Sequence, residues 1–448
     1  MKLTNMFLGG CTRNREGIVM AKKKSNTTGD GGPGLQRRQF LQAGLAGSAL
    51  AAAGTFSAPK TAGAAGLEIP DWSRQLGASV DDAPYGKPSR HESGVVRRSV
   101  EWLTATRESS INFTPLYALD GFVTPNGICF ERHHGGAADV DPVEHRLMIH
   151  GMVDRPLLFT MEDLLRLPRV SKFFFLECAA NGGMEWRNAQ LNGVQFTHGM
   201  IHCVQYTGVP LKLLLEEAGV STKAKWLMVE GGDSAGMNRS VPIEKALDDC
   251  MVAFAMNGEK LRAEQGYPLR LVVPGFEGNM WVKWLRRIEV GDESWQAREE
   301  TSKYTDLMPD GRARRFTWEM DCKSVITSPC PENPLTQKGP NVITGLAWSG
   351  RGTVKRVDVS LDGGKNWTEA RLDGPVMPKC LTRFYLDGWE WDGNPLYMQS
   401  RAIDDTGYVQ PQMTALQKVR GVNSIYHNNA IQTWHITKTG EVENVRLA

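Results

Sequence analysis

The chain has 448 residues, of which 41% are hydrophobic, 23% charged and 8% aromatic. This composition is typical of a globular protein with two or three domains, and it excludes a single small module and a disordered or fibrous chain. The 52 Lys and Arg residues nearly balance the 50 Asp and Glu residues, for a net charge of +2, so neither nucleic acid nor an extended polyanion is expected as the main partner.

The N-terminal region is typical of a secretory leader. Twin arginines in QRRQFL at residues 36–41 precede an uncharged run of small residues at 41–56, which is typical of the twin-arginine export route. The alternative, a membrane anchor, is disfavoured because the run is shorter than the roughly 20 residues that span a bilayer. We therefore expect a signal region at residues 1–64, with an alternative true start at Met20. The mature protein should be periplasmic, exported folded and without a membrane span.

The rest of the chain is predicted to form a surface-wrapping segment followed by two domains. Residues 65–110 are polar and rich in turn residues, so they should cover the surface rather than form core. Residues 111–315 combine short strands and helices and predict an α+β domain. In that domain we expect strands at 145–150, 172–177 and 269–273, a helix capped by Thr160, and a helix over 210–218 that ends at Gly219.

Residues 316–448 predict an all-β sandwich. The alternation of apolar residues over 354–361 indicates a strand that runs into a turn at Asp362-Gly363-Gly364. Short strands are expected at 381–386 and 400–403, and the regular spacing of strands and turns is typical of a sandwich.

The eight cysteines show no C-x-x-C or C-x-x-C-H spacing, which disfavours a zinc ribbon, a thioredoxin-like centre and covalently attached haem. If the protein transfers electrons, such a haem must belong to a partner. In an oxidising compartment, a disulfide could form among Cys250, Cys322, Cys330 and Cys380, with a connectivity that the sequence leaves open.

Cys178 is the first candidate for chemistry. It follows the apolar run at 173–176 and precedes the small residues at 179–183, so it should lie where a strand ends in a tight loop. Such a loop lets a bulky group approach the backbone, and a thiolate there could bind a soft metal. The alternative is a buried structural cysteine.

Several cations stand in unusual surroundings. Arg132, His133 and His134 precede two glycines, which suits an oxyanion, although a surface turn is equally compatible. Arg270 and Lys283 lie in apolar stretches and, if buried, need an anionic cofactor or an internal ion pair. Asp233 and Arg420 have the same ambiguity. The H-E-x-x-H and Walker A patterns are missing from the sequence.

Longer motifs resemble the sulfite oxidase family of molybdenum enzymes from about residue 110 to the C-terminus. They are FERHH at 130–134, ECAAN at 177–181, GYPLRLVVPG at 266–275, VKWL at 282–285 and DVSLDGG at 358–364. FERHHGG at 130–136, REETSKYTDLMPD at 298–310 and SIYHNNAI at 424–431 are more closely similar to the molybdenum subunits of the sulfane dehydrogenases in periplasmic thiosulfate-oxidising (Sox) systems.

The resemblance implies a molybdopterin domain followed by an immunoglobulin-like β-sandwich dimerisation domain. It implies Cys178 as the protein ligand of molybdenum, with Arg132, Tyr304 and Arg420 completing the catalytic set, and Tyr304 and Arg420 lining a pocket for the substrate oxyanion. The residues implied to contact the molybdenum-molybdopterin cofactor are Phe130, Arg132, His133, His134, Asp233, Gln265, Arg270, Val282 and Lys283.

Three departures from the family pattern surround the expected pocket. Gly182-Gly183-Met184 stand where an arginine usually follows the ligand cysteine, Gln265 replaces a cofactor-binding histidine, and Phe196 replaces a tryptophan. A pocket with one fixed cation fewer holds free sulfite dianion less well. It could instead admit a sulfur chain on a protein arm.

The resemblance thus implies a dehydrogenase that oxidises sulfane sulfur on a carrier protein, with water as the oxygen source and a c-type cytochrome subunit as acceptor. A homodimer of this chain within a heterotetramer is expected. The alternatives are a sulfite:cytochrome c dehydrogenase, a periplasmic methionine sulfoxide reductase and a cofactor-free scaffold subunit.

Overall fold

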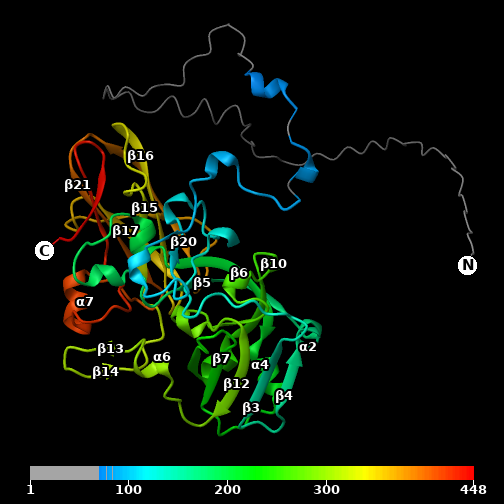
Figure 1. The fold of residues 1–448 in the computed structure, drawn as a ribbon. Helices are drawn as coiled ribbons and strands as arrows, with labels where there is room; N and C mark the ends of the chain where they lie inside the picture. The colour runs from blue at the N-terminus through cyan, green and yellow to red at the C-terminus, as the bar shows by residue number, and fades with distance from the viewer. Residues whose placement is uncertain (1–69, 77, 83, 448) are drawn as a thin grey trace, which may run out of the picture. The chain divides into compact units, whose positions relative to one another are not determined.

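Two groups of β-sheets, each with its own buried apolar core, make up the structure (Figure 1). This computed structural model describes residues 70–76, 78–82 and 84–447. The expected leader at residues 1–64, with the alternative start at Met20, lies outside the described residues. The mixture of helices and strands confirms the predicted α+β class.

The first domain contains two five-stranded sheets. The first has the order β4 (Leu157–Thr160), β3 (Arg146–Gly151), β12 (Leu285–Gly291), β7 (Trp226–Gly231) and β8 (Asn238–Pro242). Only β12 and β3 run parallel in this sheet; the other neighbours are antiparallel. The second has the order β10 (Glu259–Lys260), β9 (Met251–Met256), β6 (Ile201–Pro210) and β5 (Val170–Glu177), with β11 (Arg270–Val272) also paired to β9.

Five short helices connect and cover these strands. They are α2 (Met161–Arg166), α3 (Val194–His198), α4 (Leu211–Ala218), α5 (Ile243–Asp248) and α6 (Arg298–Thr301). The predicted cap of α2 is present: Oγ1 of Thr160 accepts a hydrogen bond from the Asp163 amide at 3.1 Å, and the Asp163 carboxylate accepts one from the Thr160 amide at 2.9 Å. The α4 helix ends at Gly219, as predicted, where φ is 70°.

Strand β5 forms a wall shared by the two domains. Phe174 and Leu176 point into the core of the first domain, whereas Phe175 points into the core of the second, as the two-residue period of a strand requires. The predicted strand at 172–177 is therefore longer than expected and buried only in its second half, since Ser171 and Lys172 are exposed. Glu177, its last residue, lies directly before Cys178.

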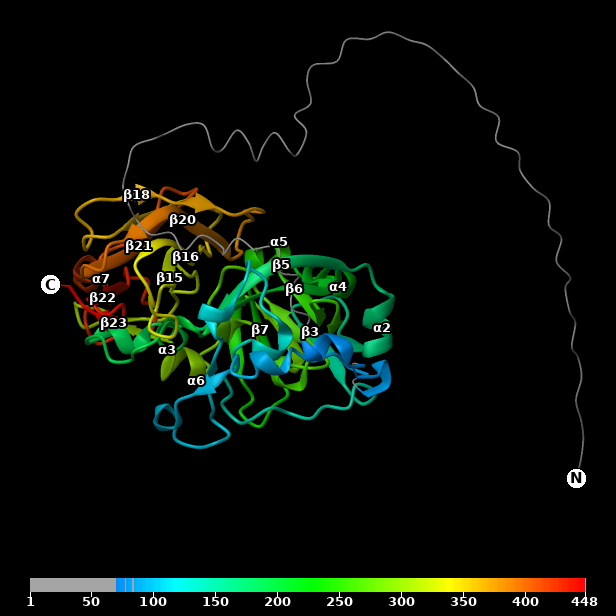
Figure 2. The ribbon, with the colours of Figure 1, turned by 90° about the horizontal axis from the view of Figure 1, so that it is seen from above.

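The second domain is a sandwich of two antiparallel sheets (Figure 2). One has the order β15 (Lys323–Ser328), β16 (Gly339–Trp348), β20 (Thr382–Trp391) and β19 (Arg371–Leu372), and the other has the order β18 (Thr368–Glu369), β17 (Val354–Ser360), β21 (Leu396–Asp404), β22 (Thr433–Ile436) and β23 (Val442–Val445). The predicted turn after β17 forms around Asp362, whose carboxylate accepts hydrogen bonds from the amides of Lys365 and Asn366.

The sandwich differs in detail from the sequence-based expectation. Strands β20 and β21 extend beyond 381–386 and 400–403, and a helix, α7 (Met413–Arg420), lies between β21 and β22. All seven described cysteines are free thiols, and no disulfide joins any two of them. Sγ of Cys380 instead lies 3.2 Å from Sγ of Cys203, across the contact between the two domains.

Two small hairpins and an N-terminal segment complete the described residues. The hairpins are β1 (Arg98–Ser99) with β2 (Asn112–Phe113) and β13 (Asp306–Leu307) with β14 (Ala313–Arg314). Between residues 84 and 110 most side chains are exposed, although Val100 and Leu103 pack against the first core. Among the residues that the structure describes, no helix is long and apolar enough to cross a membrane.

Candidate functional site

Cys178 lies at the mouth of a tight loop between β5 and β6. Its amide donates to the Met200 carbonyl at 3.0 Å, and its carbonyl accepts from the Asn181 amide at 2.9 Å. Gly182 follows in the left-handed region with φ of 81°, a conformation that favours glycine. These contacts hold Cys178 at the end of β5, where it lines a cavity.

That space, which we call the inner cavity, has an open volume of about 690 Å³. All the predicted site residues except Arg420 line it: Phe130, Arg132, His133, His134, Cys178, Asp233, Gln265, Arg270, Val282, Lys283 and Tyr304. They come from segments more than 170 positions apart in the sequence, and the fold brings them to one place.

A second space, the outer cavity, has an open volume of about 1220 Å³ and meets the inner one at Cys178. The two cavities share Arg132, His134, Cys178 and Tyr304. Most other outer walls are apolar: Leu103, Ile111, Phe113, Ala180, Met184, Phe196, Met200 and Ile425. Cys178 is thus reached from an inner side that contains the cations Arg270 and Lys283 and from an outer side with largely apolar walls.

Lys283 is held by three acceptors in the wall of the inner cavity. Its Nζ donates to the carbonyl of Arg132 at 3.2 Å and that of Glu264 at 3.0 Å, and it lies 2.9 Å from Nδ1 of His133. Burial, together with the positive charge of Arg270, lowers the pKa of Lys283 to about 7. An anion in the cavity would raise this pKa again.

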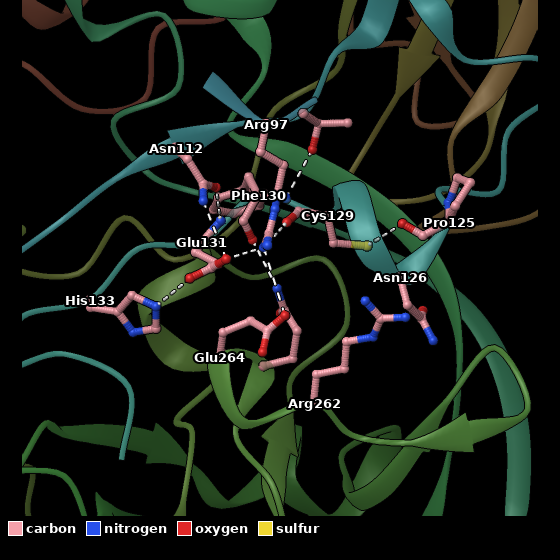
Figure 3. A network of polar contacts seen from close by, with 12 residues as sticks. Arg97, Asn112, Pro125, Asn126, Cys129, Phe130, Glu131, His133, Arg262 and Glu264 are labelled. Carbon is pink, nitrogen blue, oxygen red and sulfur yellow. Dashed lines mark hydrogen bonds and ion pairs between the residues drawn. The ribbon is translucent and has the colours of Figure 1, made fainter. Parts of the chain in front are cut away.

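Glu131 fixes the orientation of His133 from behind (Figure 3). Its carboxylate lies 2.8 Å from Nε2 of His133, accepts from Nδ2 of Asn112 at 3.3 Å and pairs with Arg97. Burial opposes ionisation, but the hydrogen bond from His133 and the charge of Arg97 hold the pKa of Glu131 below its usual value. With Nε2–H donated to Glu131, His133 offers Nδ1 as an acceptor to Lys283.

Arg270 is a buried guanidinium without a carboxylate partner among the described residues. Nη1 donates to the carbonyl and side-chain oxygens of Gln265 at 3.1 and 3.2 Å, and Nη2 donates to the Trp281 carbonyl at 3.2 Å. Its Nε is buried and has no hydrogen-bond partner in the part of the chain that the structure describes. A buried cation in this state favours an anionic ligand in the cavity.

Tyr304 and His134 form a neutral pair where the cavities meet. The Tyr304 hydroxyl lies 3.1 Å from Nε2 of His134. Burial, reinforced by the charge of Arg132, lowers the pKa of His134 to about 3, and burial raises that of Tyr304 well above its usual value. At neutral pH Tyr304 therefore keeps its proton and can donate a hydrogen bond.

Burial also raises the pKa of Cys178, although the charge of Arg132 partly opposes this. The thiol is only 8% exposed. As a soft donor it could supply one ligand to a soft metal, which would stabilise the thiolate form. Among the described residues, no group of three or more His, Cys, Asp and Glu side chains could hold a metal ion.

Arg420 is placed differently from the other predicted residues. It is the last residue of α7 and lines neither cavity. Its Nη1 lies 3.4 Å from Asp306 and its Nη2 lies 3.3 Å from Asp321. The structure therefore shows an internal ion-pair cluster at Arg420, which was the alternative that the sequence left open.

The three departures from the family pattern lie around the cavities as expected. Gly182, Gly183, Met184 and Phe196 line the outer cavity, and Nε2 of Gln265 donates to the Phe130 carbonyl at 3.0 Å beside the inner one. Arg187, the next cationic residue after Cys178 in the sequence, lines neither cavity.

Other lining residues were not anticipated from the sequence. Asn279 lines the inner cavity, and both polar atoms of its side chain are buried without a hydrogen-bond partner among the described residues. His202 lines it from β6, and Tyr426 lines the outer cavity. The position of Asn279 just before Trp281-Val282-Lys283 and that of Tyr426 within SIYHNNAI were the available signals.

Comparison with known proteins gives two family matches. The family described as "Oxidoreductase molybdopterin binding domain" matches residues 134–299, and the "Mo-co oxidoreductase dimerisation domain" matches residues 314–434. A solved structure titled as the sulfane dehydrogenase SoxCD from Paracoccus pantotrophus is similar with a TM-score of 0.84 and 60% identity, over 85% of this chain and 98% of that one.

Curated relatives are more distant. Sulfite oxidase of Gallus gallus is 30% identical over 77% of this chain and 81% of its own length. Mitochondrial sulfite oxidase of Mus musculus is 31% identical over 72% of this chain, which spans 62% of that relative's length. A nitrate reductase of Solanum lycopersicum is 31% identical over 65% of this chain and 36% of its own length.

The residues of the inner cavity fit the group that these matches imply. Molybdopterin is anionic and binds its metal through sulfur. The cavity offers the soft Cys178 thiol, together with Nε of Arg270 and the side-chain amide of Asn279, which have no hydrogen-bond partner within residues 84–447 or the described segments before them. Lys283, His133 and Asp233 add further polar groups. The cavity therefore has the donor set that an anionic, metal-bearing cofactor requires.

Proposed function

Because the chain belongs to the sulfite oxidase family of molybdenum oxidoreductases, we propose that it is a molybdenum-dependent dehydrogenase of sulfane sulfur bound to a carrier protein. Water is the oxygen source, a c-type cytochrome is the electron acceptor, and the reaction is a step of thiosulfate oxidation. The observation that carries this proposal is the position of Cys178 between a cationic inner cavity and a largely apolar outer cavity.

The inner cavity would hold the molybdenum-molybdopterin cofactor, which supplies oxygen-atom transfer coupled to two-electron redox chemistry when bound. Cys178 is its protein ligand. Arg270 and Lys283 neutralise the negative charge of the cofactor, and the Glu131–His133 pair keeps Lys283 in place. The burial of these cations supports the proposal, because each is stabilised by an anion more than by the apolar walls around it.

Arg132 and Tyr304 would act on the substrate, since both line the junction of the cavities beside Cys178. The protonated Tyr304 hydroxyl and the Arg132 guanidinium can donate to oxygen atoms as negative charge grows on the oxidised sulfur. Each oxygen taken from water releases two protons and two electrons, and the electrons leave one at a time to the cytochrome. Repeated turns would bring the sulfane sulfur to the sulfonate level.

The outer cavity supports a sulfur chain on a protein arm over free sulfite. Leu103, Ile111 and Met184 give it apolar walls, which favour an extended, weakly hydrated chain. Arg132 and Lys303 remain as cations in the outer cavity, and these favour the second candidate, a sulfite:cytochrome c dehydrogenase. The first candidate is preferred because the loop that follows Cys178 contributes no cation.

The assembly and location are part of the same proposal. The dimerisation domain supports a homodimer of this chain, which we place in a heterotetramer with the cytochrome subunit. The twin-arginine sequence at residues 36–41 supports export of the folded protein to the periplasm.

Elemental mass spectrometry of the protein exported with its own leader tests the cofactor. About one molybdenum atom per chain is expected, and folded protein without molybdenum would favour a scaffold role. Cytochrome reduction is then measured with free sulfite and with carrier-bound sulfane, with and without the cytochrome subunit. Faster turnover of free sulfite would support the second candidate, and reductive activity with a low-potential dye would support a methionine sulfoxide reductase.

A further inference from the structure

A buried hydrogen-bond cluster connects the Cys178 loop to the second domain. Glu177 is fully buried at the end of β5. Its Oε1 accepts from Nζ of Lys323 at 3.3 Å, and its Oε2 accepts from Nε1 of Trp348 at 2.7 Å. Both donors belong to the sandwich, where Lys323 of β15 and Trp348 of β16 are cross-strand partners. One end of the sandwich sheet therefore holds the residue that precedes Cys178.

The same cluster continues to the other side of Cys178. Nδ2 of Asn181 donates to Oε1 of Glu177 at 2.9 Å, and Nζ of Lys323 donates to the Asn181 carbonyl at 3.1 Å. The Asn181 side-chain oxygen accepts from the Met200 amide at 3.1 Å. Cys178 thus lies between two residues, Glu177 and Asn181, that share Lys323 as a donor.

The cluster has little freedom to rearrange. Lys323 and Trp348 are 2% and 0% exposed, so bulk water does not reach these donors, and only a small space lined by Glu177 and Lys323 adjoins the cluster. A buried carboxylate left with an unpaired oxygen is costly, and the backbone around it shifts to find another donor. At Glu177, such a shift would move the adjoining Cys178.

We propose that Lys323 and Trp348 are positioning residues for the metal-binding thiolate of Cys178 and act through Glu177 and Asn181. The sandwich then shapes the metal site in addition to its role in dimerisation. This inference rests on the proposed assignment of Cys178 as the molybdenum ligand, and it does not depend on which sulfur compound is the substrate.

The test uses the full, exported and molybdenum-loaded chain with the variant Trp348→Phe, which removes one donor and keeps an aromatic ring. The matched control is Arg383→Met. Arg383 is also a buried sandwich cation that holds an earlier segment of the chain, because it donates to the carbonyls of Leu119 and Gly121 at 2.6 and 2.9 Å, but it has no hydrogen bond to the Cys178 loop. Both changes remove a buried donor of the sandwich that holds an earlier segment of the chain, whereas only Trp348→Phe alters the cluster.

The readouts are molybdenum content, the electron paramagnetic resonance spectrum of the one-electron-reduced metal, and the separate values of kcat and KM. For Trp348→Phe we expect altered g-values and a fall in kcat of about tenfold with KM unchanged, as when groups that orient a metal ligand are removed. Loss of molybdenum from folded Trp348→Phe would also support the inference. Arg383→Met should keep the wild-type spectrum and metal content.

An unchanged spectrum and kcat in loaded Trp348→Phe, or an equal change in Arg383→Met, would overturn the inference. If Trp348→Phe does not fold, the test uses Lys323→Arg instead. This variant keeps the ion pair with Glu177 but displaces its positive charge, and the same results would support or overturn the inference. Absence of molybdenum from the wild-type chain would count against the proposed function. A normal wild-type spectrum with an insensitive variant would count against this inference alone.

Discussion

Nζ of Lys283 lies 2.9 Å from Nδ1 of His133, and this contact places a buried ammonium group in the cavity wall before any anion is bound. The Glu131 carboxylate, 2.8 Å from Nε2 of His133, sets the tautomer that makes the contact favourable. Burial makes the charged form of Lys283 unfavourable, and its pKa therefore falls to about 7.

This cost predicts how the stability of the cofactor-free chain depends on pH. The pKa of Lys283 is lower in the folded chain than in the unfolded one, so between about pH 7 and pH 9 the unfolded chain binds more protons and stability rises with pH. The rise should approach about 1.4 kcal/mol per pH unit. Thermal unfolding of wild type and Lys283→Met across this range measures it as the difference between the two proteins.

The exposed Lys223→Met is the control, which should show no such difference. The cofactor-loaded chain should also lack the rise, because an anion near Lys283 raises its pKa. A pH-independent difference between wild type and Lys283→Met in the cofactor-free chain would contradict this account.

Cys178→Ser should abolish turnover and lower the molybdenum content. A hydroxyl is a much poorer donor than a thiolate for a soft metal, and the side chain is of similar size. The sandwich core, which does not include Cys178, should stay folded. Elemental analysis and near-ultraviolet circular dichroism measure the two effects separately, and a wild-type rate in Cys178→Ser would refute the ligand assignment.

Most of the candidate site was predicted by the resemblance of its motifs to the sulfite oxidase family, and only Cys178 was also placed by the local pattern, at the end of a strand. Cys178 follows β5, as the apolar run before it indicates, whereas Lys283 forms an isolated β-bridge with Arg270 that no local pattern predicts. Arg420 could not be placed this way. Its neighbours Asp306 and Asp321 lie about a hundred residues away, and no local pattern predicts which carboxylates α7 will meet.

The contact between the domains was also beyond prediction. The apolar run before Cys178 indicated a buried strand, but it could not show that Phe174 and Phe175 enter different cores. That division depends on the sandwich packing against the outer side of β5. For the same reason, the roles of Lys323 and Trp348 near Glu177 appear only in three dimensions.

Glu185, just beyond the Cys178 loop, should destabilise the protein as the pH rises through the acidic range. It is 7% exposed and its Oε1 has no partner among the described residues, so burial raises its pKa to about 6. Between about pH 4.5 and pH 6 the folded chain binds more protons than the unfolded chain, and stability falls as the pH increases. Glu185→Gln should therefore be more stable than wild type at pH 8 by up to ~2 kcal/mol.

Chemical unfolding at pH 5 and pH 8 checks this effect, with the exposed Glu293→Gln as control. An equal stabilisation by Glu185→Gln at both pH values would show that ionisation of Glu185 is not its cause.

The loop after Cys178 offers one position where the missing cation of the substrate pocket can be restored. Gly182 has a positive φ of 81°, and a Cβ on Gly183 would lie 2.5 Å from the Ile425 carbonyl oxygen, so neither glycine readily accepts a side chain. Met184 lines the outer cavity. Met184→Arg should raise kcat/KM for free sulfite by about tenfold or more, because a charge-assisted hydrogen bond contributes roughly 1.5–3 kcal/mol.

The same change should lower kcat/KM for carrier-bound sulfane, because the larger charged side chain narrows an apolar channel. Met184→Leu keeps the wall apolar and should leave both values within about twofold. Steady-state cytochrome reduction with each substrate measures the ratio of the two values, and this ratio is insensitive to the fraction of loaded enzyme. If Met184→Arg changes both values by the same factor, the lack of a cation after Cys178 does not determine the choice between the two substrates.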